Sequence, residues 1–479
     1  MNTDDTIVAI STPRGRGGLG VVRLSGNKAL LIAEQLLRRA PPKQPADTQD
    51  NGLDLRPWRV RSAALTDEEG GLMDRVLVSW FRKPRSYTGE DVVEISAHGS
   101  PVILEFLLGR CIAVGARLAE PGEFTLRAFL NGRMDLTQAE AVHDLIEAQT
   151  LYQAKVAAQQ VEGAVSHRIS PFKKQLVDLI ALLEAGIDFA EDDVSVLSTA
   201  EISGRLAPIE EGLSQMAQSF RAGKIIRQGL VLAIVGRPNV GKSSLFNCLL
   251  QQDRAIVTAT PGTTRDLVSE TIELEGIPLR FVDTAGIRHA FEEAESIGVR
   301  KSYEAAVDSD LALLVLDGSQ DMTAEDRDLL ARLSGLGKLV VVVNKCDLSL
   351  RLGPENLQQE LAQTGPTATA SNCSASILFV SALKREGIEK LRQTILETAA
   401  PALAGHRETQ LLTNIRQERL VRESQAALAD AQESLRAGVP HEMVLLDLYN
   451  SLRPLDAITG ETTVEDILTH IFSTFCIGK

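Results

Sequence analysis

The sequence predicts three structural parts: an α+β N-terminal domain, an all-helical domain in two pieces, and a doubly wound α/β domain inserted between those pieces. Short β-branched runs mix with helical stretches over 1–125. Apolar residues recur three and four positions apart from 136 to about 223 and again from about 405 to 479, which indicates helices. Strand-like and helix-like segments alternate over 228–400. A chain of 479 residues is long enough for about three such domains.

The first domain, residues 1–125, contains the strand-like runs TIVAI, GVVRL, RVLVSWF and DVVEIS and the helical stretch KALLIAEQLLRRA. A polar, proline-containing stretch at 41–52 interrupts it. The segment GRGGLG at 15–20 matches part of a dinucleotide-binding fingerprint, but the helix that this motif requires does not follow. A turn between strands is the better interpretation.

The helical domain is predicted in two halves, 126–227 and 401–479, which flank the α/β domain at 228–400. FKKQLVDLIALLEAGIDFAED and LTNIRQERLVRESQAALADAQESL are examples of its periodicity. The simplest architecture packs both halves into one domain, and a coiled-coil arm is the alternative for the long helices. Within the α/β domain, the small-residue stretch 362–376 is expected to be a surface loop.

The most informative motif is GRPNVGKS at 236–243, which fits G-x-x-x-x-G-K-[ST], the loop that holds nucleotide phosphates. It follows the apolar run VLAIVG and precedes a helix whose N-terminus adds partial positive charge. Backbone N–H groups of such a loop face the anion, Lys242 reaches the β- and γ-phosphates, and the Ser243 hydroxyl ligates Mg²⁺. The alternative is a glycine-rich turn that matches by chance, and three partner motifs argue against it.

Each partner motif follows a strand-like run. DTAG at 283–286 would hold Mg²⁺ through Asp283, directly or through water, and offer the Gly286 N–H to the γ-phosphate. In NKCD at 344–347, Asp347 can accept both N–H groups of the guanine edge. Adenine lacks them and would leave a buried carboxylate unpaired. SAL at 381–383 would be a backbone clamp for the guanine oxygen. Together the motifs predict a Ras-like GTPase domain.

The loop TATPGTTRD at 258–266 lies where a magnesium-sensing switch belongs. Its threonine hydroxyls and the side-chain oxygen of Asn239 suit a hard cation. We hypothesise that a monovalent ion there supplies the positive charge that an arginine gives in other GTPases. The predicted GTP-binding residues are Asn239, Val240, Gly241, Lys242, Ser243, Ser244, Thr258, Ala259, Thr260, Pro261, Gly262, Thr263, Thr264, Asp283, Thr284, Ala285, Gly286, Asn344, Lys345, Cys346, Asp347, Ser381, Ala382 and Leu383.

The group that orients the attacking water is not the usual one. Ras-like proteins carry a glutamine directly after the DxxG motif, whereas this chain has Ile287, which cannot hydrogen-bond water. Acidic candidates follow at Glu292, Glu293 and Glu295. The alternative is that these three residues are a solvated acidic start to the next helix.

Several long blocks resemble a known family. DTIVAISTPRGRGGLGVVRLSG (5–26), SYTGEDVVEISAHG (86–99), RLAEPGEFTLRAFLNGRMDLTQAEAVHDLI (117–146) and FCIGK (475–479) are similar to the tRNA uridine-modification GTPases of the MnmE (TrmE) family. The GTPase segment resembles the potassium-activated, translation-factor-related group to which that family belongs. The match runs from near Met1 to Lys479 and is looser near 40–72 and 350–376.

The resemblance implies an activity beyond GTP hydrolysis. Family members work with the FAD-binding partner MnmG, in a heterotetramer, to build carboxymethylaminomethyl or aminomethyl groups on C5 of the wobble uridine in certain tRNAs. A tetrahydrofolate derivative, 5-formyl- or methylene-tetrahydrofolate, binds the N-terminal domain and is implicated as one-carbon donor. The resemblance also implies a homodimer formed through the folate-binding-like N-terminal domain and, transiently, through the GTPase faces.

Site residues carry over by position. Arg23, Glu94, Arg133 and Lys479 stand at the folate-contacting positions, although Arg133 is usually lysine in the family, which changes the contact geometry. Asn239, Thr258, Thr260 and Thr263 stand at K⁺-ligand positions, Ser243 and Thr264 at Mg²⁺ positions, and Glu295 at the general-base position. Cys476 lies close to Lys479, so a nucleophilic role stands beside the ordinary interpretation as a packing or inert thiol.

Composition agrees with this interpretation. Apolar residues make up 44% and charged residues 24%, as in ordinary globular proteins. Five scattered cysteines show no metal-ligand spacing and indicate a reducing compartment. No run approaches the length of a membrane span, and the acidic start is unlike a signal peptide, so a cytoplasmic protein without membrane contact is expected.

A net charge of −14 is unusual for a tRNA-binding protein. We therefore expect modest tRNA affinity for the chain alone, with a partner providing much of the phosphate contact. The main alternative function is a GTP-dependent RNA-binding switch of the ribosome-assembly type, which shares PNVGKS and PGTTRD. A second is a folate enzyme whose GTPase domain is purely regulatory.

Overall fold

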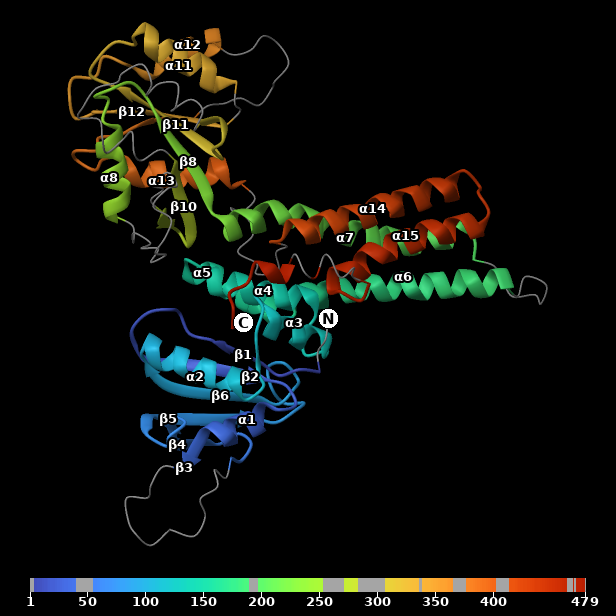
Figure 1. Cartoon of the computed structure of the whole chain (residues 1–479). Helices are drawn as coiled ribbons and strands as arrows, with labels where there is room; N and C mark the ends of the chain where they lie inside the picture. Colours follow the sequence, from blue (N-terminus) through green and yellow to red (C-terminus); the bar gives the residue numbers. More distant parts are fainter. Residues whose placement is uncertain are drawn as a thin grey trace. The chain divides into compact units, whose positions relative to one another are not determined.

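The computed structural model describes residues 4–39, 55–188, 197–252, 271–282, 306–335, 338–364, 376–401, 413–462, 468 and 471–478. The chain divides into two compact units (Figure 1). The first consists of Met1–His143, Val161–Ser170 and Arg453–Lys479, and the second of Asp144–Gln160 and Pro171–Leu452. The four-segment domain boundaries expected from the sequence remain a prediction.

The first unit contains a seven-stranded sheet with the order β3-β4-β5-β6-β2-β1-β7. Its strands are β1 (Ile7–Ile10), β2 (Gly17–Ser25), β3 (Leu37–Arg39), β4 (Val60–Thr66), β5 (Leu72–Phe81), β6 (Val92–Gly99) and β7 (Arg117–Leu118). β1 and β7 pair in parallel, and the other neighbours are antiparallel. The glycine-rich segment at 15–20 is only partly the predicted turn, because its residues from Gly17 onward already belong to β2.

Alternation along β2 and β6 decides which residues face the core. Val22 pairs with Ile95 and Leu24 with Val93, and these apolar residues pack with helices α1 (Ala29–Leu36) and α2 (Pro101–Ala113). Because successive side chains point to opposite faces of a sheet, the pair formed by Arg23 and Glu94 lies on the other face.

The C-terminal segment packs within the first unit. Phe472 and Phe475 share a core with Leu126 of α3 (Glu123–Leu130) and with Leu136 and Ala139 of α4 (Leu136–Glu147). Ile477 forms an isolated antiparallel bridge with Pro121, and Figure 1 shows the C-terminus next to α3 and α4. A segment far away in sequence therefore completes the N-terminal structure.

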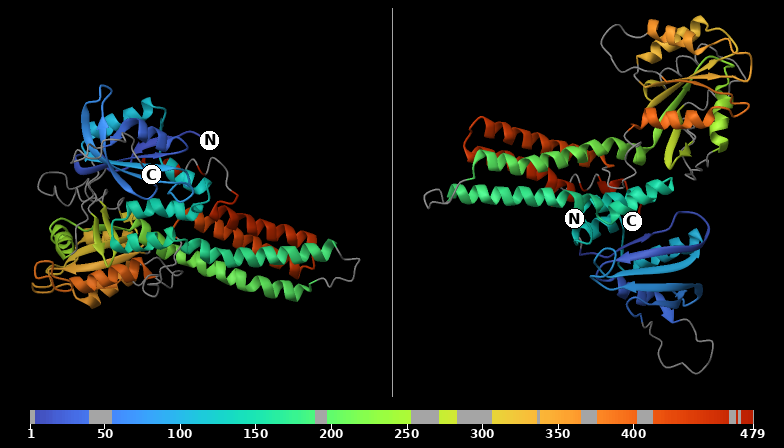
Figure 2. Two further views of the ribbon diagram at one scale, coloured as in Figure 1. Left: turned by 90° about the horizontal axis from the view of Figure 1, so that it is seen from below. Right: turned by 180° about the vertical axis from the view of Figure 1, so that it is seen from behind.

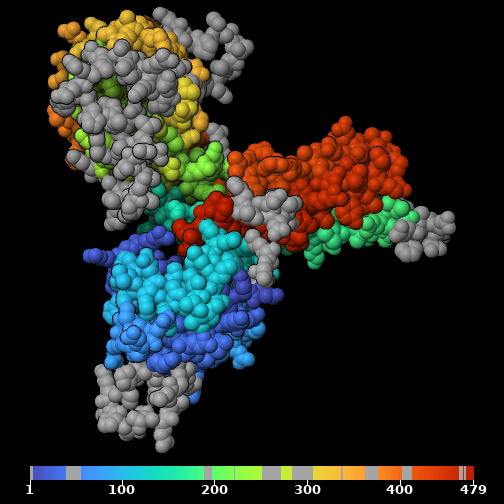
Figure 3. Space-filling model, in the orientation of Figure 1, coloured from blue at the N-terminus to red at the C-terminus, as the bar shows by residue number. Residues whose placement is uncertain are grey.

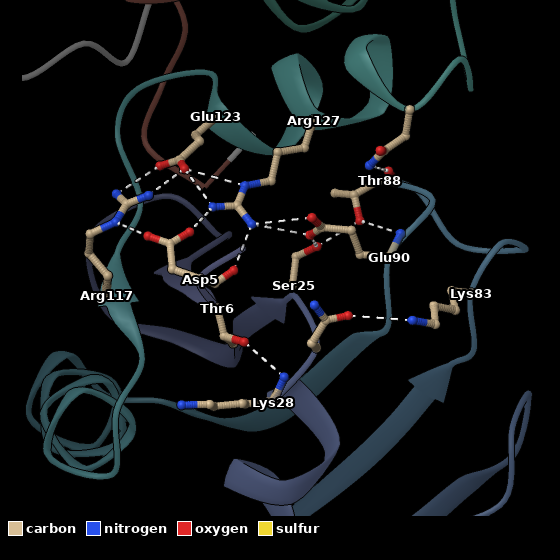
Figure 4. Close-up of polar contacts among 12 residues, drawn as sticks. Asp5, Thr6, Ser25, Lys28, Lys83, Thr88, Glu90, Arg117, Glu123 and Arg127 are labelled. Atoms are coloured by element: carbon tan, nitrogen blue, oxygen red, sulfur yellow. Dashed lines mark hydrogen bonds and ion pairs between the residues drawn. The ribbon is translucent and has the colours of Figure 1, made fainter. Parts of the chain in front are cut away.

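A buried charge network ties α3 to the sheet of this unit (Figure 4). The side chain of Arg127 is 1% exposed and pairs with the carboxylates of Asp5, Glu90 and Glu123. Arg117 bridges Asp5 and Glu123 from the other side. Because one guanidinium serves three carboxylates and a backbone carbonyl, it holds the start of β1, the loop before β6 and α3 together.

Long helices before and after the α/β domain pack together in the second unit (Figures 2 and 3). They are α5 (Leu151–Val161), α6 (Ala164–Asp188), α7 (Thr199–Gln228), α14 (Ile415–Arg436) and α15 (His441–Thr459), with the start of α6 and the end of α15 in the first unit. The Tyr449 hydroxyl donates to Glu184 at 2.6 Å, and Gln432 donates to Glu210 at 3.0 Å. The long helices that precede the α/β domain thus contact those that follow it, while the division into a discontinuous helical domain or a coiled-coil arm remains a prediction.

The α/β domain has a six-stranded sheet with the order β13-β12-β11-β8-β10-β9, in which the β9–β10 pair is antiparallel and the rest are parallel. Its strands are β8 (Leu230–Val235), β9 (Thr271–Leu274), β10 (Ile277–Val282), β11 (Leu311–Asp317), β12 (Leu339–Asn344) and β13 (Ser376–Phe379). Its helices are α8 (Lys242–Gln252), α11 (Ala324–Ser334), α12 (Pro354–Thr364) and α13 (Ile388–Ala399). Both ends of the stretch predicted as a loop at 362–376 belong to regular elements, because α12 reaches Thr364 and β13 begins at Ser376, and residues 365–375 lie outside the described part of the chain.

Burial on both faces explains the long apolar runs of this sheet. Alternate residues of β11 enter different cores: Leu313 and Val315 pack on the side of α8 and α13, and Leu314 and Leu316 on the side of α11 and α12. This is the doubly wound arrangement that the sequence predicts. In such folds ligands bind beyond the carboxyl ends of the strands.

Candidate nucleotide-binding site

The predicted phosphate loop connects the end of β8 to the start of α8. Asn239 and Gly241 have φ angles of +63° and +95°, in the region that asparagine tolerates and glycine prefers. A Cβ added at Gly241 would overlap Nδ2 of Asn344. Glycine at 241 therefore allows the phosphate loop and the NKCD loop to approach each other.

Lys242 lies folded into this loop. Its ammonium donates hydrogen bonds to the carbonyls of Gly236 at 2.6 Å and Arg237 at 2.8 Å. Burial lowers the pKa of Lys242. Ser243 and Ser244 follow in the first turn of α8. The loop thus combines a cation with a helix N-terminus, and such a combination favours an anion.

Asn344 joins three of the predicted motifs. It ends β12, and its Nδ2 donates to the carbonyl of Val240 in the phosphate loop at 3.0 Å. Its Oδ1 accepts a hydrogen bond from the backbone N–H of Ala382 in the SAL motif, also at 3.0 Å. Three segments far apart in sequence therefore meet at one buried side chain.

Asp347 and Ser381 form the other contact between NKCD and SAL. The Ser381 hydroxyl donates to Asp347 Oδ1 at 2.6 Å, and this bond holds the pKa of the half-buried carboxyl below its usual value. Leu383 is exposed, and the Cys346 backbone N–H donates to the carbonyl of Val380. One carboxylate oxygen of Asp347 is thus oriented by the protein.

One buried residue beside this site was missed by the sequence analysis. Asp317 ends β11, next to Asn344 in the parallel ladder, and its carboxylate lies 2.6 Å from Lys345 Nζ. The signal was present in the sequence, because Asp317 is a polar residue at the carboxyl end of an apolar run, the position at which the GTPase motifs also occur.

Several predicted residues lie outside the described part of the chain. They are Thr258, Ala259, Thr260, Pro261, Gly262, Thr263, Thr264, Asp283, Thr284, Ala285, Gly286 and Glu295. Of the predicted K⁺ ligands the structure therefore describes Asn239, and of the predicted Mg²⁺ ligands Ser243. Among the described residues, no group of three histidine, cysteine or acidic side chains is arranged to hold a metal ion.

The predicted N-terminal site gathers around Arg23. Its Nε donates to Glu94 Oε1 at 2.9 Å, and its guanidinium carbon lies 5.6 and 5.7 Å from the ring centres of Tyr87 and Phe124. Arg23 Nη1 also donates to the carbonyl of Gly478 at 3.4 Å, which places the C-terminal segment at this pair.

The structure describes two further residues predicted near that site, Arg133 and Cys476. Arg133 Nε donates to the carbonyl of Ser86 at 3.1 Å. Cys476 is exposed, and its carbonyl accepts a long hydrogen bond from Gly122 N–H at 3.5 Å. Lys479 lies outside the described residues.

Family models match nearly the whole chain. The model "GTP-binding protein TrmE N-terminus" matches residues 6–133, and "MnmE helical domain" matches 136–476. The tRNA modification GTPase MnmE of Koribacter versatilis is 54% identical over the full length of both chains. The chain belongs to the MnmE family of tRNA modification GTPases. The predicted resemblance is therefore confirmed, and the protein is a GTP hydrolase.

More distant relatives agree. The tRNA modification GTPases MnmE of Aquifex aeolicus and Acetivibrio thermocellus are each 40% identical, over 99% and 100% of this chain and the whole of their own. Among solved structures, the G domain of the T. maritima FeoB iron transporter aligns over 36% of this chain and 98% of its own, at 24% identity and a TM-score of 0.26, a score too low to carry an argument. No helix within the described ranges is long and apolar enough to traverse a bilayer.

Proposed function

We propose that this GTPase couples GTP hydrolysis to modification of the wobble uridine of certain tRNAs at C5. In this proposal an FAD-binding MnmG-type protein is the partner, and a folate-derived one-carbon unit supplies the carbon of a carboxymethylaminomethyl or aminomethyl group. The observation that carries it is the 54% identity to a tRNA modification GTPase over the full length of both chains. The matched region includes the N-terminal domain and the C-terminal FCIGK as well as the GTPase motifs.

Guanine nucleotide binding is supported by the arrangement around Asn344. Lys242 lies at one end for the phosphates, and Asp347 lies at the other for the base edge. Asn344 fixes the spacing between these two ends, because it bonds to both the phosphate loop and the SAL backbone. A buried amide whose nitrogen and oxygen both form hydrogen bonds holds the segments that it connects in a fixed arrangement.

In this proposal hydrolysis depends on Asn239 and Ser243 of the phosphate loop and on residues that lie outside the described part of the chain. Ser243 and Thr264 would hold Mg²⁺, and Asn239, Thr258, Thr260 and Thr263 would hold K⁺. These cations would offset the negative charge that develops on the phosphate oxygens. Glu295 would accept a proton from the attacking water, the role that Ile287 cannot fill.

The Arg23–Glu94 pair supports the folate part of the proposal. A cation and an acceptor side by side, with Tyr87 and Phe124 alongside, suit a flat, hydrogen-bonding ring. Arg133 and Lys479 would complete the site for 5-formyl- or methylene-tetrahydrofolate. Cys476 would be the nucleophile of the modification chemistry.

The charge of −14 supports a shared role in tRNA binding. A homodimer of this chain would join the MnmG-type partner in a heterotetramer, and that partner would contact many of the tRNA phosphates. The complex would work in the cytoplasm.

The proposal is tested with tRNA from cells that lack the protein and are complemented with variants. Mass spectrometry of digested tRNA quantifies the modified wobble uridine. We expect loss of the modification in the deletion strain and with Glu295→Ala, and full restoration with wild type and with the matched control Glu293→Ala. Unchanged wobble uridine in the deletion strain would contradict the proposal, and accumulation of immature ribosomal subunits there would favour the assembly-switch alternative.

A further inference from the structure

Asp317 is a buried carboxylate beside the nucleotide site that none of the GTPase motifs contains. Its side chain is 3% exposed at the end of β11. Burial opposes its ionisation, but hydrogen bonds from Lys345 and Ser319 outweigh that cost, and its pKa lies below the ordinary value. A buried ionised carboxylate is retained only with such partners.

The partners of Asp317 belong to two loops. Lys345 Nζ lies 2.6 Å from Oδ2, while the Ser319 backbone N–H and hydroxyl donate to Oδ1 at 3.0 and 2.7 Å. Lys345 has a φ of +64°, which is uncommon for a residue with a side chain. A backbone held in this conformation, together with an anchored ammonium, fixes the lysine at both ends.

The same connection between β11 and α11 also reaches the phosphate loop. Arg237 Nη2 donates to Gln320 Oε1 at 3.1 Å. Arg237 Nε lies 3.0 Å from Asp326 Oδ2, although the alignment is not that of a hydrogen bond. Thr323 caps α11 by accepting a hydrogen bond from the Asp326 backbone N–H, and it donates in return to the same Asp326 carboxylate. One short segment thus contacts both loops that are assigned to the nucleotide.

We propose that Asp317 is a positioning residue for guanine nucleotide binding. By anchoring the ammonium of Lys345, it holds the aliphatic stem of that lysine as a fixed apolar surface for one face of the base. Asp347, two residues further along the same loop, reads the edge of the base. The inference deepens the proposed nucleotide site and depends on it.

Face and edge contacts predict different specificities. Every purine has an apolar face, so loss of the Lys345 surface weakens all purine nucleotides alike. Inosine lacks the 2-amino group from which Asp347 would accept a hydrogen bond. A change in the contact between Asp347 and the base edge therefore alters the ratio of GTP affinity to inosine triphosphate affinity. The ratio therefore distinguishes the role of Asp317 from that of Asp347.

The test measures equilibrium affinities of the full-length chain for GTP, GDP and inosine triphosphate. Asp317→Asn should weaken all three by about tenfold, since a hydrogen bond to a charged group is lost. The GTP to inosine triphosphate ratio should remain that of wild type. Asp321→Asn is the matched control, because it makes the same chemical change in the same connection at a side chain that is 81% exposed. It should bind like wild type.

A double-mutant cycle asks whether Asp317 acts through Lys345. Lys345→Met removes the ammonium and keeps the stem length, with the exposed Lys390→Met as its control. In the Lys345→Met background, Asp317→Asn should have no further effect on affinity. Should Asp317→Asn fail to fold, Ser319→Ala should weaken binding in the same direction and show the same dependence on Lys345.

Three results would overturn the inference: wild-type affinity in Asp317→Asn, an undiminished effect in the Lys345→Met background, or a changed GTP to inosine triphosphate ratio. Failure of the wild-type chain to bind GTP would instead contradict the nucleotide site itself. The two kinds of failure are thus separate.

Discussion

The hydroxyl of Ser381 donates a hydrogen bond of 2.6 Å to Oδ1 of Asp347, a residue 34 positions earlier in the chain. The bond keeps the carboxyl ionised by lowering its pKa, and an ionised carboxylate only accepts hydrogen bonds. Guanine presents two donors on the edge that Asp347 would meet, whereas xanthine presents an acceptor in place of the amino group. This geometry makes base preference a sensitive test of the site.

Asp347→Asn should exchange that preference. The amide loses one acceptor and gains a donor, so GTP affinity should fall by at least about tenfold while xanthosine triphosphate affinity rises. Competition binding with the two nucleotides measures the ratio. A parallel loss for both nucleotides would show that Asp347 does not read the base edge.

Gly241→Ala should disrupt the close approach of the phosphate loop to Asn344 of the NKCD loop. The residue has a φ of +95°, and an added methyl group would overlap Asn344 Nδ2. We expect a loss of about 1–3 kcal/mol in the free energy of unfolding together with loss of GTP binding. Gly353→Ala is the control, since its added methyl group meets nothing within 4 Å and its φ is not positive. Equal behaviour of the two variants in thermal unfolding and GTP titration would refute the prediction.

Arg127→Met should destabilise the first unit. The side chain is 1% exposed, and its loss leaves the Asp5, Glu90 and Glu123 carboxylates close together without their shared cation. Breaking a buried pair in this way costs about 3 kcal/mol or more. Urea unfolding measures this cost, and the exposed Arg59→Met should change little. A difference below about 0.5 kcal/mol between the two variants would argue against the network.

The same network sets a dependence of stability on pH. Burial opposes ionisation of Asp5 and Glu123, but arginine hydrogen bonds outweigh it, so the pKa of each carboxyl lies below its ordinary value. Their stabilisation is complete above the ordinary values of 3.8 and 4.5 and is lost as the pH falls through the lower folded values. Wild type should lose unfolding free energy in that acid range, and Arg127→Met should lose less. An identical acid slope for both chains would contradict this.

Gly478→Ala should release the C-terminal segment from the first unit. Gly478 has a φ of +100°, an added Cβ would lie 2.5 Å from the Ile10 carbonyl, and the Ser11 hydroxyl donates to the Gly478 carbonyl at 3.0 Å. A strain of about 1–2 kcal/mol shifts the docking equilibrium about tenfold. Binding of 5-formyl-tetrahydrofolate should weaken accordingly.

A matched control separates backbone strain from this contact. Gly438 has a similar positive φ of +68°, and an added methyl group there meets nothing within 4 Å. Gly438→Ala should therefore bind the folate like wild type. If both variants bound it equally well, docking of the C-terminal segment would not matter to the site.

The local pattern of apolar residues predicted the helices and strands of the fold well, because buried positions are apolar in the sequence. Strand β12 is buried on both faces and reads as an unbroken apolar run, and the long helices show their apolar stripe. The phosphate loop and NKCD were predictable because each motif has characteristic residue types at fixed spacing, and few other structures require that pattern.

Contacts between residues far apart in the chain could not be predicted from this local pattern. The pair of Arg23 with Gly478, 455 positions apart, and the pair of Arg127 with Asp5 depend on which faces of the fold meet. A charged residue reads as solvated surface until its neighbours are known, and Arg127 is among the most buried side chains of the chain. Asp317 differs from these residues, because its position at the carboxyl end of an apolar strand is visible in the sequence, whereas its pairing with Lys345, 28 residues away, is not.

The most direct test of the whole account is steady-state turnover of GTP and ATP in potassium and in sodium salts of equal ionic strength. We predict that GTP is hydrolysed, that potassium supports faster turnover than sodium, and that ATP is a poor substrate. Glu295→Ala should slow hydrolysis without weakening GTP binding, while Glu293→Ala should behave like wild type. A preference for ATP, or equal GTP turnover in the two salts, would contradict the account.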